Sequence, residues 1–127
     1  MASIGVKEVR ARGRECLNLK IKVELHGTVP FRRASDLLIP DRPGVYIMHD
    51  LRGALYVGRT TSLRRRFLQH EGEPSNPLIP TARQNPVGQL CFSWIVLDDP
   101  KRCKAVEAEL IVALDPPCNR CIPTVTH

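Results

Sequence analysis

The sequence predicts an α/β fold: a small mixed or antiparallel sheet with a three-stranded core, flanked by helices, with an extra N-terminal strand. Two β-prone runs at 45–48 and 54–57 predict a hairpin. Capped amphipathic helices are expected at 62–70 and 100–114. The chain has 127 residues, which is room for one domain with a modest core but not for two.

The hairpin carries the only two tyrosines of the chain, Tyr46 and Tyr56, one on each strand. Residues 50–53 join the strands and have the composition of a turn. Gly44 and Gly58 stand at the outer ends, where they permit a close approach of another backbone or side chain. Taken alone, this pattern fits a purely structural hairpin with two packed tyrosines equally well.

The first helix follows a good N-cap cluster at 60–62 and stops before glycine and proline residues. At about 100° per residue, Leu63 and Phe67 define its inward side. Arg66 and His70 then fall within roughly 60° of Leu63, on the same side.

The three consecutive arginines of this helix are therefore not equivalent. Arg64 and Arg65 point away from the core and are expected in solvent. Arg66 lies at the edge of the core and needs an anionic partner or a bound phosphate, because desolvating a lone guanidinium is costly. For His70, a hydrogen-bonded structural histidine is the plain alternative to a catalytic one.

The second helix has Asp99 as its expected N-cap and Pro100 as its first residue, and it stops before the prolines at 116–117. One arc of the helix is apolar and consists of Cys103, Val106, Leu110, Ala113 and Leu114. Glu107 lies inside this arc and Glu109 outside it. A carboxylate on an apolar face is protonated, paired or bound to a metal, so both an ion pair with Arg66 and a divalent-cation site remain open for Glu107.

The remaining elements complete the sheet. Residues 17–25 alternate apolar and polar side chains and predict a half-buried extra strand, behind a basic arm at 9–14. A short helical turn is expected at 36–39 and a third core strand at 91–97. We therefore divide the chain into an arm and extra strand (1–42), a compact core (43–121) and a tail (122–127).

In this order and spacing the motifs resemble the GIY-YIG nuclease superfamily, over about 43–119. Gly44-Val45-Tyr46 and Tyr56-Val57-Gly58 match the two motifs that name the family, with valine in place of isoleucine. Arg66, ten residues after Tyr56, matches the family's essential arginine. His70, Glu107 and Asn119 match a common histidine, the metal-binding glutamate and the terminal asparagine.

This resemblance implies a one-metal endonuclease that hydrolyses phosphodiester bonds in DNA with Mg²⁺ or Mn²⁺. It implies that Glu107 holds the metal, that Arg66 contacts the phosphate, and that Tyr46, with Tyr56 next to it, orients or deprotonates the attacking water. His70 is implied as a further catalytic residue. Tyr46 is the preferred base, which requires nearby positive charge to lower its pKa. Contacts with nucleic acid are expected from Arg59, Arg64, Arg65 and Asn119.

Composition agrees with a nucleic-acid partner. The formal net charge is +6 and the isoelectric point is about 9.4. No signal peptide or membrane-spanning run is apparent, so we expect a cytoplasmic protein that does not bind membranes. The five cysteines are expected to be reduced. A zinc site at Cys118 and Cys121, completed by Cys103 and His127, is the minor alternative.

Two other functions use the same residues. The first is a non-catalytic nucleic-acid-binding module or subunit on the same scaffold, and the second is an RNA-directed nuclease. The sequence does not separate DNA from RNA, and it does not reveal the target. Specificity could come from the N-terminal strand and arm, from a homodimer or from a partner protein, so repair, restriction and mobile-element roles all stay open.

Overall fold

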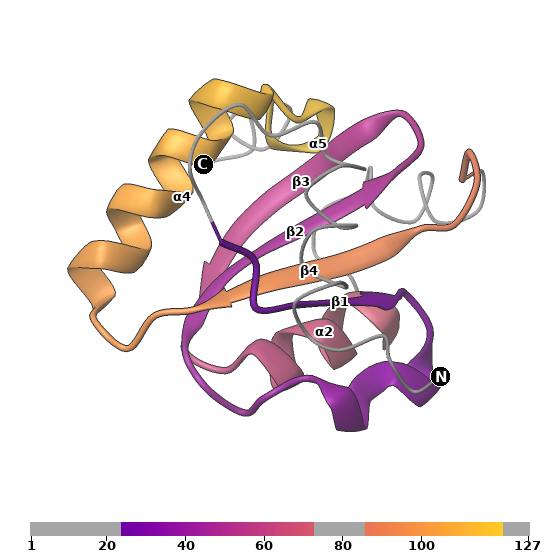
Figure 1. Ribbon diagram of the computed structural model, residues 1–127, viewed down its shortest axis with the longest axis horizontal. Coiled ribbons are helices and arrows are strands. Elements are labelled where there is room, and N and C mark those ends of the chain that lie inside the picture. Colours follow the sequence, from indigo (N-terminus) through magenta and orange to yellow (C-terminus); the bar gives the residue numbers. More distant parts are fainter. Residues whose placement is uncertain (1–23, 73–85, 121–127) are drawn as a thin grey trace.

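The computed structural model describes residues 24–72 and 86–120, which form a four-stranded antiparallel sheet with helices on both faces (Figure 1). The strands run in the order β1-β4-β2-β3. The elements in chain order are β1 (Gly27–Pro30), the 3₁₀ helix η1 (Arg33–Leu38), β2 (Gly44–Asp50), β3 (Gly53–Thr60), α2 (Leu63–Gly72), β4 (Cys91–Val96), α4 (Pro100–Leu114) and α5 (Pro117–Arg120). The predicted fold class is confirmed.

The predicted hairpin forms the centre of the sheet. In the strand β2, which is buried along its whole length, Tyr46 lies opposite Gly58 of β3 on one side and Trp94 of β4 on the other. The register of β2 and β3 shifts after Met48. At this point two residues of β3, Leu55 and Tyr56, take the place that one residue has in a regular antiparallel pair. Because of this bulge, both side chains pack on the same face of the sheet.

A strand precedes the core at a position that the sequence did not predict. The strand β1 pairs with β4, and Gly27 lies opposite Trp94. The predicted range 17–25 lies mostly outside the described residues, and its last two residues, Glu24 and Leu25, are not in a strand. A Cβ on Gly27 would lie 2.3 Å from the Trp94 ring, so a large side chain fills the space beside this glycine. The basic arm at 9–14, the segment 73–85 and the tail at 122–127 also lie outside the described residues.

The two faces of the sheet carry separate hydrophobic clusters. One cluster packs α2 against the sheet and includes Phe67, Phe92 and the Tyr46 ring. The other packs α4 through Cys103 and Leu110 onto the opposite face. Figure 1 shows α4 and α5 beside β3, at the opposite side of the sheet from β1. The short helix α5 adds Cys118 to the first cluster, so the chain after α4 passes around the β3 edge of the sheet.

Both long helices begin and end near the predicted residues. The Ser62 side chain caps α2 by accepting a hydrogen bond from the Arg65 backbone N–H. Asp99 caps α4 in the same way through Lys101 N–H, and Asp115 closes this helix with a left-handed φ of 45°. Leu63 and Phe67 are completely buried, as the helical wheel predicted. Ala113, expected on the apolar arc of α4, is exposed because the arc in contact with the sheet is narrower than the wheel suggested.

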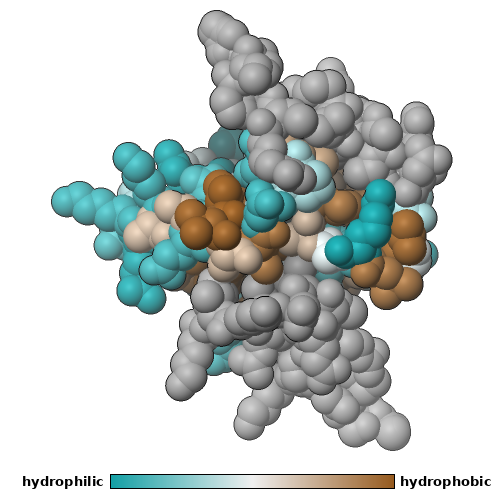
Figure 2. Space-filling view, turned by 90° about the horizontal axis from the view of Figure 1, so that it is seen from above, coloured by the Kyte–Doolittle hydropathy of each residue, from teal (hydrophilic) through white to brown (hydrophobic). Residues whose placement is uncertain are grey.

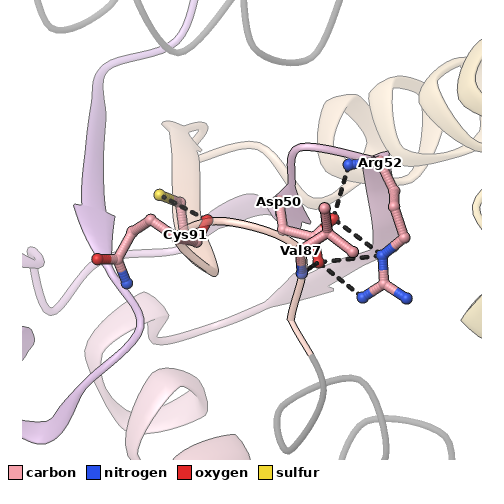
Figure 3. Close-up of polar contacts among 5 residues, drawn as sticks. Asp50, Arg52, Val87 and Cys91 are labelled. Carbon is pink, nitrogen blue, oxygen red and sulfur yellow. Dashed lines mark hydrogen bonds and ion pairs between the residues drawn. The ribbon is translucent and has the colours of Figure 1, made fainter.

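The hairpin turn is held by the buried carboxylate of Asp50 (Figure 3). It accepts hydrogen bonds from the backbone and guanidinium of Arg52, the shortest of them 2.6 Å, and from Val87 N–H at 3.0 Å. Burial alone would raise the pKa of Asp50, but the hydrogen bonds from Arg52 and Val87 outweigh burial and lower it. Asp50 therefore ties the turn to the chain that leads into β4.

Seen from the side of α4 and α5, the surface is hydrophilic around the beginning of α4 and carries apolar patches further along the molecule (Figure 2). The exposed apolar side chains include Val112 on α4, and Leu51 and Val87 beside the hairpin turn. Within 24–72 and 86–120, every helix is too short or too polar to cross a bilayer.

Candidate active site

The two motif glycines are explained by what lies against them. A Cβ on Gly44 would stand 2.1 Å from the carbonyl oxygen of Ile95, so β2 and β4 approach too closely for any side chain there. A Cβ on Gly58 would stand 2.5 Å from the Tyr46 hydroxyl. Gly58 thus makes the space that the Tyr46 ring occupies, and the expected close approach at both glycines is confirmed.

Tyr46 is the centre of a buried polar cluster that also contains Tyr56, Arg66 and His70, named here the tyrosine cluster. The Tyr46 hydroxyl lies 2.8 Å from Nε2 of His70. It also accepts a hydrogen bond of 3.2 Å from Nε of Arg66. The Tyr56 ring lies 6.0 Å from the Tyr46 ring and 5.7 Å from the imidazole, centroid to centroid. The structure therefore brings together four of the five predicted catalytic residues.

The hydrogen bonds indicate where the protons of this cluster lie. Arg66 can only donate, so the Tyr46 oxygen accepts from it and directs its own proton to Nε2 of His70. Burial, followed by the charge of Arg66, lowers the pKa of His70 to about 4. We therefore assign a neutral imidazole with its proton on Nδ1, an atom that is buried without a hydrogen-bond partner among the described residues.

Arg66 alone does not give Tyr46 the lowered pKa that a tyrosine base requires. Burial, and then the neighbouring Tyr56, raise the pKa of Tyr46, and these effects outweigh the opposing effect of Arg66. The Tyr46 side chain is only 1% exposed, whereas Tyr56 is half-buried. A tyrosinate at Tyr46 is thus disfavoured, and Tyr56 is the tyrosine with access to solvent.

Glu107 lies on the face of α4 that is turned toward β3, and it forms an ion pair with Arg59 in place of the Arg66 pair that the sequence left open. Its Oε1 accepts a hydrogen bond of 2.7 Å from Arg59, not from Arg66. The Glu107 side chain is 20% exposed and Arg59 is 46% exposed, so the pair lies at the surface. Arg66 instead donates to Tyr46 and to the side chain of Gln69. Glu107 and the tyrosine cluster are therefore separate polar groups, with Arg59 and Tyr56 three residues apart on β3.

Glu107 fits a site for a hard divalent cation. One of its oxygens is bound by Arg59, the carboxylate is partly open to solvent, and Mg²⁺ is commonly held by one or two carboxylates together with water and phosphate oxygens. Within the described part of the chain no group of three or more acidic, histidine or cysteine side chains is placed to share an ion. The zinc alternative involves Cys121 and His127, which lie outside the described residues. Of the described cysteines, Cys103 and Cys118 are buried and Cys91 is half-buried.

The residues predicted to contact nucleic acid have different surroundings. Arg65 is exposed, as expected. Arg64 is half-buried, and its Nε donates to the carbonyl oxygen of Ile39, which joins α2 to the end of η1. The Asn119 amide accepts from Val57 N–H and donates to Val57 C=O, both at 2.8 Å. Asn119 thus pairs with the free edge of β3 as a neighbouring strand would, a structural role that sequence reasoning missed.

Sequence reasoning also missed a cleft next to Arg59. It has a volume of about 290 Å³ and is lined by Pro43, Arg59, Thr60, Thr61, Asp98, Pro100 and Cys103. The alternation of β3 could have indicated it, because Arg59 shares a face with Val57, which packs on the α4 side of the sheet. The cleft therefore lies at the end of β3, beside the beginning of α4.

Comparison with known proteins agrees with these features. The family model that describes the GIY-YIG catalytic domain matches residues 42–119 of this chain. UvrABC system protein C of Synechococcus sp. (strain JA-2-3B'a(2-13)) is 37% identical over 100 residues, which are 72% of this chain and 16% of that protein. The protein of the same name from Moorella thermoacetica is 37% identical over 75 residues, or 58% of this chain and 12% of its own length. The chain thus spans less than a fifth of either relative.

Among solved structures, the fold is similar to that of the GIY-YIG N-terminal endonuclease domain of UvrC from Thermotoga maritima, bound to its catalytic magnesium. The TM-score is 0.56 at 24% identity, over 68% of this chain and 93% of that domain. The predicted resemblance is confirmed by the motifs, the sheet and these matches together. The chain therefore belongs to the GIY-YIG nuclease superfamily.

Proposed function

We propose that this protein is a metal-dependent endonuclease that hydrolyses phosphodiester bonds in DNA. The observation that supports this most strongly is the tyrosine cluster, in which a guanidinium and a neutral imidazole contact the same tyrosine hydroxyl. Such a group combines a cation for a phosphate with a base for a proton, which are two needs of phosphodiester hydrolysis. A buried hydrogen-bond network with only a structural role would not require an arginine that is still partly exposed.

Arg66 would bind the non-bridging oxygens of the scissile phosphate with the guanidinium N–H groups not used for Tyr46. Tyr56, at the solvent side of the cluster, would hold the attacking water. The proton of this water would pass to the Tyr46 hydroxyl while Tyr46 passes its own proton to Nε2 of His70. This relay avoids a full tyrosinate at a position where burial raises the pKa of Tyr46.

The phosphate would also improve His70 as a base. The charge of Arg66 is the second cause of the lowered His70 pKa, and a bound phosphate neutralises part of that charge. Glu107 would hold Mg²⁺ or Mn²⁺, whose charge would stabilise the phosphate and the leaving oxygen when the ion is bound.

DNA is the proposed substrate because the relatives are UvrABC system proteins and the chain carries a net charge of +6. The site itself offers no feature that distinguishes DNA from RNA. A homodimer, a partner protein and a cytoplasmic location remain predictions.

The test is cleavage of duplex, single-stranded, flap and branched DNA, and of matched RNA, with Mg²⁺, Mn²⁺ or a chelator. We expect metal-dependent cleavage of at least one DNA substrate. Glu107→Ala should abolish it while most binding remains, because arginine contacts to phosphate provide the affinity. The matched control is Glu109→Ala on the exposed face of the same helix, which should be nearly silent.

Two outcomes would contradict the proposal. Equal losses from Glu107→Ala and Glu109→Ala would show that Glu107 has no special role. Tight binding without cleavage, on every substrate and with either metal, would favour the non-catalytic module.

A further inference from the structure

The carboxylate of Glu107 has two candidate partners, the Arg59 guanidinium and a divalent cation. Glu107 is the candidate metal ligand, yet its Oε1 already accepts a hydrogen bond of 2.7 Å from the Arg59 guanidinium. A divalent cation on the same carboxylate would stand close to this guanidinium, and like charges at such a distance repel. Binding of the ion and retention of the pair therefore oppose each other.

The pair is not needed to hold α4 in place. Cys103, Val106 and Leu110 already pack this helix against the sheet, on the cluster that includes Val57 of β3. The Arg59 side chain is 46% exposed, and ion pairs of this exposure contribute little to stability. The Arg59 guanidinium can therefore leave Glu107 without unfolding the site.

A released Arg59 has a suitable place to bind phosphate. It lines the cleft of about 290 Å³ together with Thr60 and Thr61, whose hydroxyl groups can donate to phosphate oxygens. The acidic residue of this cleft, Asp98, is already paired with Arg42 at 2.5 Å. The freed guanidinium would thus meet a phosphate more readily than a second carboxylate.

We infer that Arg59 couples metal binding to nucleic-acid binding: a divalent cation on Glu107 releases its guanidinium to a backbone phosphate in the adjacent cleft. This inference rests on the proposed function, since it needs Glu107 as the metal ligand. Coupling of this kind is reciprocal, so metal tightens nucleic-acid binding and nucleic acid tightens metal binding.

The direct test measures Mn²⁺ binding by electron paramagnetic resonance on the full chain without nucleic acid. Arg59→Gln should bind Mn²⁺ more tightly than the wild type, by roughly two- to fivefold, because it removes an ion pair of the exposed kind. Arg59→Lys keeps a competing cation and should lie near the wild type. The control is Arg65→Gln, which removes one exposed charge at the beginning of α2 and should leave Mn²⁺ affinity unchanged.

A second measurement follows the released guanidinium. In a Tyr46→Phe background, which slows cleavage, fluorescence anisotropy with a duplex should show that Mn²⁺ raises DNA affinity. Adding Arg59→Gln should reduce this gain, whereas adding Arg65→Gln should weaken binding equally with and without metal.

The outcomes separate the two hypotheses. If Glu107→Gln does not weaken Mn²⁺ binding, Glu107 is not the ligand, and the metal-dependent function fails together with this inference. If Mn²⁺ binding depends on Glu107 but Arg59→Gln leaves it unchanged or weaker, only the coupling is overturned. In that case Arg59 is a structural or supporting partner of the metal ligand.

Discussion

Two buried histidines lie on opposite faces of the same sheet and have nearly the same local chemistry. His70 contacts the Tyr46 hydroxyl at 2.8 Å, and His49 contacts the Ser93 hydroxyl at 2.7 Å. Each side chain is 1% exposed, and each has an Nδ1 without a hydrogen-bond partner among the described residues. Burial is the largest cause that lowers the pKa of both imidazoles to about 4.

The two histidines differ in what their hydroxyl partners contact next. The Tyr46 hydroxyl also accepts a hydrogen bond from Arg66, which is partly exposed, and the Tyr46 ring packs beside the half-buried Tyr56. The Ser93 hydroxyl also forms a hydrogen bond of 2.7 Å with the Thr28 hydroxyl, where β4 pairs with β1. A shifted histidine pKa alone therefore does not mark a catalytic site in this fold. A neighbouring cation and a route to solvent are what separate the tyrosine cluster from the His49 pair.

The largest expected effect comes from removing that cation. Arg66→Ala should slow cleavage by at least about 10²–10³-fold, as expected when a charge partner of the transition state is lost. Single-turnover kinetics at saturating enzyme separates this loss from weaker binding. Arg64→Ala and Arg65→Ala should mainly weaken binding and flatten its salt dependence. An inactive Arg65→Ala beside an active Arg66→Ala would refute the assigned roles of the two arginines.

Removing the hydroxyl partner of each histidine should separate activity from stability. Tyr46→Phe keeps the packed ring, and it should fold normally and cleave at least about a hundredfold more slowly. Ser93→Ala should leave the cleavage rate unchanged and lower the free energy of unfolding by about 1–3 kcal/mol, because Nε2 of His49 loses its partner. The measurements are single-turnover rates and urea unfolding on both variants. A rate loss in Ser93→Ala as large as in Tyr46→Phe would remove the distinction between the two faces.

The second tyrosine tests the route to solvent. Tyr56→Phe should be slower than the wild type by about tenfold or more, because its hydroxyl would hold the attacking water. The non-catalytic alternative predicts no change from either tyrosine substitution. Full activity of the Tyr46→Phe, Tyr56→Phe double variant would refute the proposed proton relay.

The sequence predicted the parts of the site that depend on local periodicity. The phase of α2 placed Arg66 and His70 on the inward side, and the phase of α4 placed Glu107 toward the sheet, because a helical period fixes which residues share a face. The pairing of Glu107 with Arg59 joins residues 48 positions apart and depends on how α4 crosses β3. No periodicity within one element contains that information, so the sequence offered Arg66 and not Arg59 as the alternative ion-pair partner of Glu107.

The raised Tyr46 pKa and the position of β1 escaped prediction for related reasons. Burial of Tyr46 results from Phe67 of α2 and Phe92 of β4 packing in one cluster, a long-range event. The strand β1 consists of Gly-Thr-Val-Pro, a sequence with two poor strand formers, and it forms because β4 offers a free edge. Tertiary contacts, not local propensity, decided both.

The smallest expected effect is on the free energy of unfolding at acid pH, and it should be the same for the two histidines. A histidine with an ordinary pKa of 6.5 that falls to about 4 on folding binds more protons when the chain is unfolded. Its contribution is therefore fully present above pH 6.5 and is lost as the pH falls toward 4. Each histidine should add a slope of at most about 1.4 kcal/mol per pH unit in this window. Asp50, whose pKa is lowered from 3.8, acts only at lower pH.

Urea unfolding at pH 4, 5, 6 and 7 checks this prediction. His49→Gln and His70→Gln should each remove about half of the pH dependence between 4 and 6.5, whatever they do to stability at pH 7. Only His70→Gln should also slow cleavage, since the His49 pair lies on the other face of the sheet, away from Arg66 and Tyr56. A variant of His49 that keeps the full pH dependence would show that folding does not lower the pKa of this imidazole, which would contradict the likeness between the two histidines.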